Sequence, residues 1–132
     1  MNAAELEKFG GTLAGVAVAV RGDDELVLSV AGHAFATLCL CGPERGRLSF
    51  AVEAGHFVEL TARAGIVPAH YTARPFWITL IEPERFGAAQ TQAFVRRSYE
   101  LVREGLSKRQ QVLLAARESA APKKRAVRKR KD

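Results

Sequence analysis

The sequence of 132 residues has little cysteine and no long apolar run. Cys39 and Cys41 are separated by one residue, a spacing that suits neither a disulfide nor a zinc knuckle. We interpret them as reduced thiols on one face of a strand. The apolar segment at residues 13–20 is far shorter than the roughly 18 residues that span a membrane. Because the N-terminus also lacks a cationic leader, we expect a cytoplasmic chain without a membrane partner.

The sequence also lacks the patterns that mark catalytic and metal-binding sites. No H-x-x-H, H-E-x-x-H, C-x-x-C or G-x-S-x-G is present. His70 and Tyr71 could supply acid–base chemistry, but the nearby chain offers neither an orienting carboxylate nor a nucleophile. We therefore expect no enzyme, no cofactor and no metal, and keep an enzyme centred on His70 as a minor alternative. The acidic residues 22–25 are interpreted as a hairpin tip.

Apolar periodicity predicts an α+β domain with an antiparallel meander sheet and helices packed on one of its faces. The domain is expected at residues 1–116, followed by a disordered basic tail at 117–132. The last helix is predicted to break or bend at Gly105, with Val112 and Leu113 continuing its apolar face. The expected strands cover 16–20, 26–30, 35–40, 48–52 and 76–82. The expected helices are a short N-terminal helix, a helix at 53–65 with Gly65 as its cap, and a long helix at about 84–116.

The segment "GIVPAHYTARPFWITL" at residues 65–80 combines polar and aromatic side chains with two prolines. Pro68 and Pro75 favour extended backbone before them and prevent a helix from continuing. Alternation in the strand that follows places Trp77 and Thr79 on one side, and Ile78 and Leu80 on the other. We expect one side to be core and the other only partly covered. The segment is therefore interpreted mainly as a turn into a strand.

This segment, together with "VRRSYELVREGL" at residues 95–106, resembles the MmcQ/YjbR family of small bacterial proteins. The matching elements are the Pro-Ala-His-Tyr stretch, the Trp that opens the next strand, and Ser-Tyr-Glu-Leu-Val in the last helix. "VAGHAFATL" also resembles an early segment of the family, so the likeness covers about residues 25–108. It implies a CyaY-like (frataxin-like) fold with a double-wing arrangement of strands, and DNA binding. It implies a structural role for Pro68, His70, Tyr71, Trp77, Ser98 and Tyr99.

Two parts of the chain depart from the family pattern. The segment "GVAVAVRGDDELVLSV" is hard to align with the usual N-terminal helix and first strand. The basic C-terminus is an addition that the pattern does not require.

The net charge of +6 comes from the C-terminus. Removal of residues 123–132 takes away seven basic residues and one acidic residue, and leaves thirteen of each. Seven cations in nine residues attract polyanions by releasing counterions. Arg74, Arg96 and Arg97 are secondary candidates, although Glu100 and Glu104 could pair with the last two. The predicted phosphate contacts are Lys123, Lys124, Arg125, Arg128, Lys129, Arg130 and Lys131.

These features favour a non-enzymatic nucleic-acid-binding protein, with DNA preferred over RNA as the partner. Most of its affinity is expected from phosphate contacts, because no helix has polar side chains spaced for base recognition. The alternative is a protein-interaction module in which an exposed sheet face or edge captures a partner. The tail would then serve solubility alone. The sequence leaves the oligomeric state open.

Overall fold

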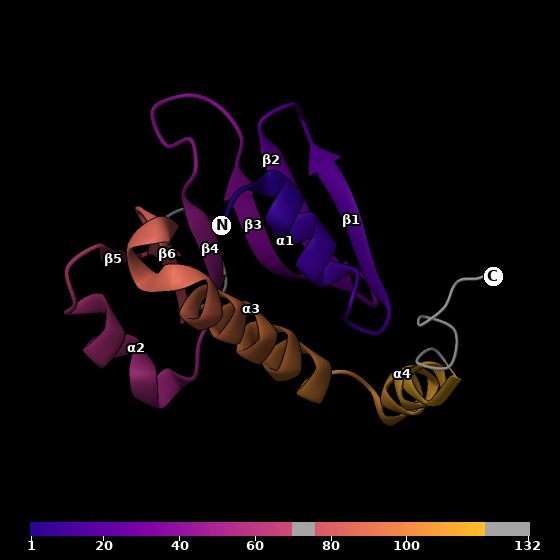
Figure 1. Ribbon diagram of the computed structural model, residues 1–132. Coiled ribbons are helices and arrows are strands. Elements are labelled where there is room, and N and C mark those ends of the chain that lie inside the picture. Colours follow the sequence, from indigo (N-terminus) through magenta and orange to yellow (C-terminus); the bar gives the residue numbers. More distant parts are fainter. Residues whose placement is uncertain (70–75, 121–132) are drawn as a thin grey trace.

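A six-stranded antiparallel sheet forms the centre of the protein (Figure 1). The computed structural model describes residues 1–69 and 76–120. Within this part of the chain the strand order is β1-β2-β3-β4-β6-β5, so the first four strands form the predicted meander. β5 is inserted at the far edge, where it pairs with β6. The strands are β1 (Val16–Arg21), β2 (Glu25–Val30), β3 (His33–Cys39), β4 (Leu48–Ala51), β5 (Ile66–Pro68) and β6 (Trp77–Leu80).

Helices α1 and α3 lie on the same face of this sheet (Figure 1). The prediction of an α+β fold with helices packed on one face is therefore confirmed. In the described residues no helix is both long and apolar enough to cross a membrane. The helices are α1 (Ala3–Gly10), α2 (Ala54–Thr61), the short 3-10 helix η1 (Pro83–Phe86), α3 (Gly87–Glu104) and α4 (Lys108–Ala120).

The hydrophobic core lies between the sheet and the helices. Alternate residues of the strands point into it, among them Leu26 and Leu28 of β2 and Ile78 and Leu80 of β6. The alternation predicted for residues 77–80 is therefore correct. The opposite side of β6 is more covered than predicted, since Trp77 and Thr79 are also buried. The reason is that β5 adds a strand beyond β6, so β6 is an inner strand of the sheet.

A β-bulge in β3 sets the position of Phe35. Leu28 of β2 pairs with Ala36, whereas the next residue, Ser29, pairs with Ala34. Phe35 is thus the extra residue, and both Phe35 and Ala36 are fully buried. A bulge places two residues opposite one and interrupts the ladder of hydrogen bonds. The backbone of Phe35 therefore needs a partner from outside β2.

Two predicted helix boundaries differ from the structure. α2 ends at Thr61, and Gly65 lies beyond a turn, with a φ of 84° at the start of β5. The predicted helix over 84–116 consists of η1, α3 and α4, and the break expected at Gly105 is confirmed. α4 continues to Ala120, past the predicted end of the domain at residue 116. Ser107 begins this new helix by accepting a 3.2 Å hydrogen bond from the backbone N–H of Gln110.

The two cysteines do not share the face of a strand as predicted. Cys39 is the last residue of β3, whereas Cys41 lies in the following loop and is exposed. Both are free thiols, and Cys39 Sγ donates a 3.2 Å hydrogen bond to the carbonyl oxygen of Cys41. The strand ends early because the chain turns through Gly42 and Gly46, which both have positive φ.

Candidate nucleic-acid interface

Arg97, a predicted phosphate contact, is paired with three carboxylates of the protein. Its guanidinium lies 3.1 Å from Glu53, 3.0 Å from Glu100 and 3.3 Å from Glu104. The hydrogen bond from Arg97 holds the pKa of Glu53 below its usual value of 4.5. An arginine surrounded in this way offers little net positive potential to a phosphate. Arg97 therefore serves to join the start of α2 to α3.

Arg96, the residue before Arg97 in α3, contacts an aromatic ring instead of a carboxylate. Its guanidinium is 5.3 Å from the centre of the Phe9 ring in α1, within the range of a cation–π contact. The residue is exposed and has no carboxylate within ion-pair distance among the described residues. It is one isolated cation, because the adjacent Arg97 is neutralised. Arg74, His70, Tyr71 and the seven cations of residues 123–131 lie outside the described residues.

Three further arginines of the domain also have an acidic partner. Arg21 pairs with Glu25, Arg47 with Glu44, and Arg85 with Glu82, at 3.4, 3.8 and 3.6 Å between the paired atoms. Such exposed pairs contribute little stability, but they leave a surface of mixed sign. The described part of the domain therefore has no large cationic patch of its own on α3 or the sheet.

Helix α4 is attached to the domain by one buried side chain and a small set of polar contacts. Leu114 is buried directly against Gly15, so closely that a Cβ at Gly15 would overlap Leu114 Cδ2. Arg103 of α3 makes a two-pronged contact with Glu118, with distances of 2.8 and 2.9 Å. This hydrogen bond lowers the pKa of Glu118. These contacts fix α4 against the end of α3 and the segment before β1.

Helix α4 also has three cations that the sequence pattern did not single out. Lys108, Arg109 and Arg117 are all exposed. Among the described residues, none of them has a carboxylate within ion-pair distance. They lie 6 to 15 positions before Lys123, the first of the seven cations of residues 123–131. The sequence feature that could have identified them is their position, because they extend the basic C-terminal region back to residue 108.

Val112 and Leu113 also lie on the exposed side of α4, contrary to the prediction that they continue the apolar face of α3. Their exposed fractions are 65% and 58%. The break at Gly105 gives α4 its own axis, and Leu106 and Leu114 face the core in their place. An open groove beside α4 is lined by Gly15, Ala31, Leu113 and Arg117.

The matching residues of the last helix make structural contacts. Ser98 Oγ donates a 2.6 Å hydrogen bond to the carbonyl oxygen of Phe35 and accepts one of 2.9 Å from the backbone N–H of Ala51. Tyr99 packs edge-on against the Phe35 ring and donates a 2.7 Å hydrogen bond to the carbonyl oxygen of Ala14. Burial raises the pKa of the Tyr99 hydroxyl. Of the remaining matching residues that are described, Pro68 ends β5 and Trp77 begins β6.

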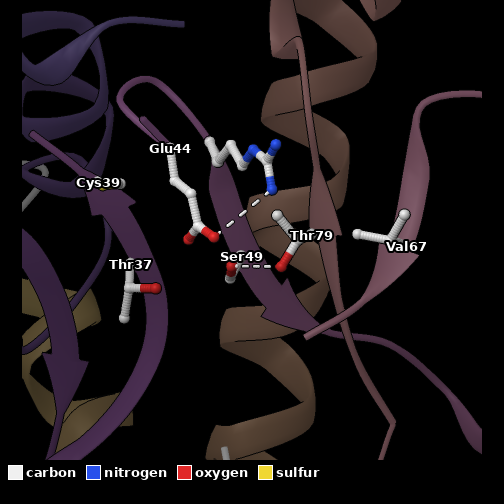
Figure 2. Close-up of a pocket in the computed structure, with 7 residues that line it drawn as sticks. Thr37, Cys39, Glu44, Ser49, Val67 and Thr79 are labelled. Atoms are coloured by element: carbon white, nitrogen blue, oxygen red, sulfur yellow. Dashed lines mark hydrogen bonds and ion pairs between the residues drawn. The ribbon is translucent and has the colours of Figure 1, made fainter. Parts of the chain in front are cut away.

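The sheet face opposite α1 and α3 was a second candidate surface. Figure 2 shows Thr37, Ser49, Thr79 and Val67 in one row across neighbouring strands, beside Glu44. Ser49 and Thr79 share a 2.7 Å hydrogen bond between their hydroxyls. The enclosed space beside them is about 20 Å³, room for one water molecule. This hollow is therefore too small for a substrate.

No set of three His, Cys, Asp or Glu side chains in residues 1–69 and 76–120 is arranged to hold a metal ion. The acidic residues Asp23 and Asp24 lie in the turn between β1 and β2, as predicted for a hairpin tip.

Comparison with known proteins identifies a similar fold. The chain superimposes on the crystal structure of Deinococcus radiodurans protein DR2400, which has a DUF419 family-model domain, with a TM-score of 0.74. The alignment covers 86% of this chain and 88% of that chain, at 22% sequence identity. At this identity the likeness establishes the fold alone. No family model matches the sequence, and no curated protein matches it.

Proposed function

We propose that this chain is a non-enzymatic DNA-binding protein of the MmcQ/YjbR type, in which α4 and the C-terminal residues 121–132 together contact phosphates. The observation that supports this most directly is the distribution of available cations. Five arginines, Arg21, Arg47, Arg85, Arg97 and Arg103, are paired with carboxylates. Among the described residues, the exposed cations without such a partner are Lys8, Arg45, Arg63 and Arg96, each on a separate segment, and Lys108, Arg109 and Arg117, which all lie within α4.

Because these cations lie close to the basic residues 123–131 in the sequence, we expect their phosphate contacts to add to those of residues 123–131. Residues 108–132 contain ten basic residues, which are Lys108, Arg109, Arg117 and the seven cations of 123–131. The same range contains two acidic residues, Glu118 and Asp132. Glu118 is itself paired with Arg103. Each phosphate contact releases counterions and adds about 0.9 to the slope of log affinity against log salt. Contacts of this kind give affinity without base specificity.

The neutral domain has a separate part in this function. Residues 1–107, which precede α4, have twelve acidic and ten basic residues and therefore no net positive charge, so we assign them the role of carrying and positioning α4. The residues that do so are Leu114, Gly15, Arg103 and Glu118. DNA is favoured over RNA by the resemblance to a family with that assigned role.

The test measures the affinity for a labelled DNA duplex at a series of salt concentrations. We expect the full chain to show a salt slope of about five or more, and a chain ending at Ala121 to lose most of it. Arg109→Gln is expected to lower the slope by about 0.9, because it removes one phosphate contact. Arg97→Gln is the matched control: it also removes one arginine, but we expect its slope to be unchanged, since Arg97 already contacts three carboxylates.

Undiminished binding by the chain ending at Ala121 would show that the C-terminus is not the contact surface. Equal effects of Arg109→Gln and Arg97→Gln would remove α4 from the interface. An RNA duplex of the same length, bound more tightly than DNA at every salt concentration, would replace DNA as the partner.

A further inference from the structure

Strand β1 is the outermost strand on one side of the sheet (Figure 1), and its outer edge lacks the usual protection. It has six residues and pairs with β2 in unbroken register from Val16–Val30 to Arg21–Glu25. Residues 16–20 read Val-Ala-Val-Ala-Val, without charge or proline. In an antiparallel ladder, alternate residues direct their N–H and C=O groups away from the paired strand. Natural edge strands usually carry lysine, proline or a bulge to prevent further pairing.

The opposite edge of the sheet is protected. β5 has three residues and ends in Pro68, which has no backbone N–H to donate. The bulge of this sheet lies between the inner strands β2 and β3, where it does not disturb β1. Within the described residues, the two edges are therefore unequal, and β1 is the one able to add a strand.

We propose that β1 pairs with β1 of a second copy of this chain, antiparallel about a two-fold axis at Val18. The Val-Ala-Val-Ala-Val segment is its own complement in this register. Val16 lies opposite the partner's Val20, and Ala17 lies opposite the partner's Ala19. The two six-stranded sheets would then form one continuous sheet, in which the same surface of each copy is used.

The side chains of β1 fit this arrangement on both faces. Val16 and Val18 pack against the core of their own copy, but Val20 is 57% exposed. Pairing would bring each Val20 against the partner's Val16, which removes apolar surface from water. On the other face Ala17 and Ala19 are exposed and small, so they present no obstacle to an approaching strand.

The charges do not oppose the contact. Arg21 is the sole charged residue of β1, and it lies three residues from the proposed axis. The two copies of Arg21 would be six residues apart along the ribbon, about 20 Å at about 3.4 Å per residue. That separation exceeds the screening length of about 8 Å in physiological salt. Because the contact is one strand wide, the dimer is expected to be weak and reversible.

The experiment is sedimentation equilibrium of the full chain from micromolar to millimolar concentration, in salt high enough to screen the basic C-termini. We expect a concentration-dependent dimer. Ala19→Lys places two like charges on neighbouring strands beside the axis and is expected to raise the dimer dissociation constant by about tenfold or more. Val58→Lys is the matched control, since it adds the same charge at a 76% exposed valine of α2. Its dissociation constant should be that of the unsubstituted chain.

A second substitution tests the register. In Ala17→Glu/Ala19→Lys, each introduced glutamate lies opposite the introduced lysine of the partner, so dimerisation should return to at least its original strength. Circular dichroism verifies folding, and Ala17→Lys takes the place of Ala19→Lys if that variant does not fold. A chain that is monomeric throughout, Ala19→Lys and Val58→Lys with equal effects, or failure of the double substitution would each overturn the proposal. Capture of an extended peptide by a monomeric chain would overturn it as well.

Discussion

Ser98 Oγ donates a 2.6 Å hydrogen bond to the carbonyl oxygen of Phe35, which is the extra residue of the bulge in β3. The same oxygen accepts a bond from the N–H of Ala51 in β4. One hydroxyl on α3 thus satisfies one backbone group of β3 and one of β4, beside the bulge that interrupts the ladder between β2 and β3. This contact explains why a serine stands within the apolar face of α3, where an aliphatic side chain would otherwise be expected.

Ser98→Ala should therefore lower the free energy of unfolding by about 2 to 4 kcal/mol, because it leaves two backbone groups without a partner. Urea denaturation followed by the fluorescence of Trp77 measures this change. Ser29→Ala removes a serine from a half-buried position of β2 and should cost less than about 0.5 kcal/mol. Similar losses for the two substitutions would contradict the bridging role of Ser98.

Gly15→Ala should detach α4 from the domain. A Cβ at this position overlaps Leu114, and the φ of 72° is unfavourable for alanine. Gly32→Ala is the matched control, since Gly32 has a φ of 80° but no atom near its Cβ position. We expect Gly32→Ala to cost about 1 to 2 kcal/mol from backbone strain alone, and Gly15→Ala to cost about 1 kcal/mol more from the overlap.

Limited proteolysis distinguishes the two glycine variants further. Cleavage between residues 105 and 120 should become faster in Gly15→Ala and stay slow in Gly32→Ala. If both chains are cleaved at the rate of the unsubstituted protein, Leu114 does not hold α4 in place.

The contact between Arg103 and Glu118 should make the stability of the protein depend on pH. The pKa of Glu118 is lower in the folded protein than its ordinary value of 4.5. Its stabilising effect is therefore fully present above pH 4.5 and is lost as the pH falls below 4.5 through the folded value. Thermal unfolding of the unsubstituted chain and of Glu118→Gln should differ at neutral pH and converge in acid. A difference that persists at low pH would mean that Glu118 acts through packing and not through its charge.

The sequence was informative about the strands because hairpins are local. β1 to β4 are bounded by short segments rich in glycine and charged residues, and alternation places their apolar side chains toward the core. The same reasoning missed β5. Its three residues are too few to show a period, and its identity as a strand depends on pairing with β6, which begins nine positions after β5 ends.

The candidate interface was predictable only where its interactions are local. The pairing of Arg97 with Glu100 follows from helical spacing, but the contact with Glu53 joins residues 44 positions apart. Nothing in the sequence near Arg97 indicates that partner. Likewise, the period of α3 predicts that Val112 and Leu113 continue its apolar face, whereas the change of axis after Gly105 places them on the surface.

Pro68 has a consequence for the size of any assembly built on the sheet. A two-fold pair formed through β1 uses both open edges at once and leaves a β5 with its proline at each outer end. Growth then terminates at two molecules, whereas a sheet open on both sides could add copies without limit and polymerise into fibres.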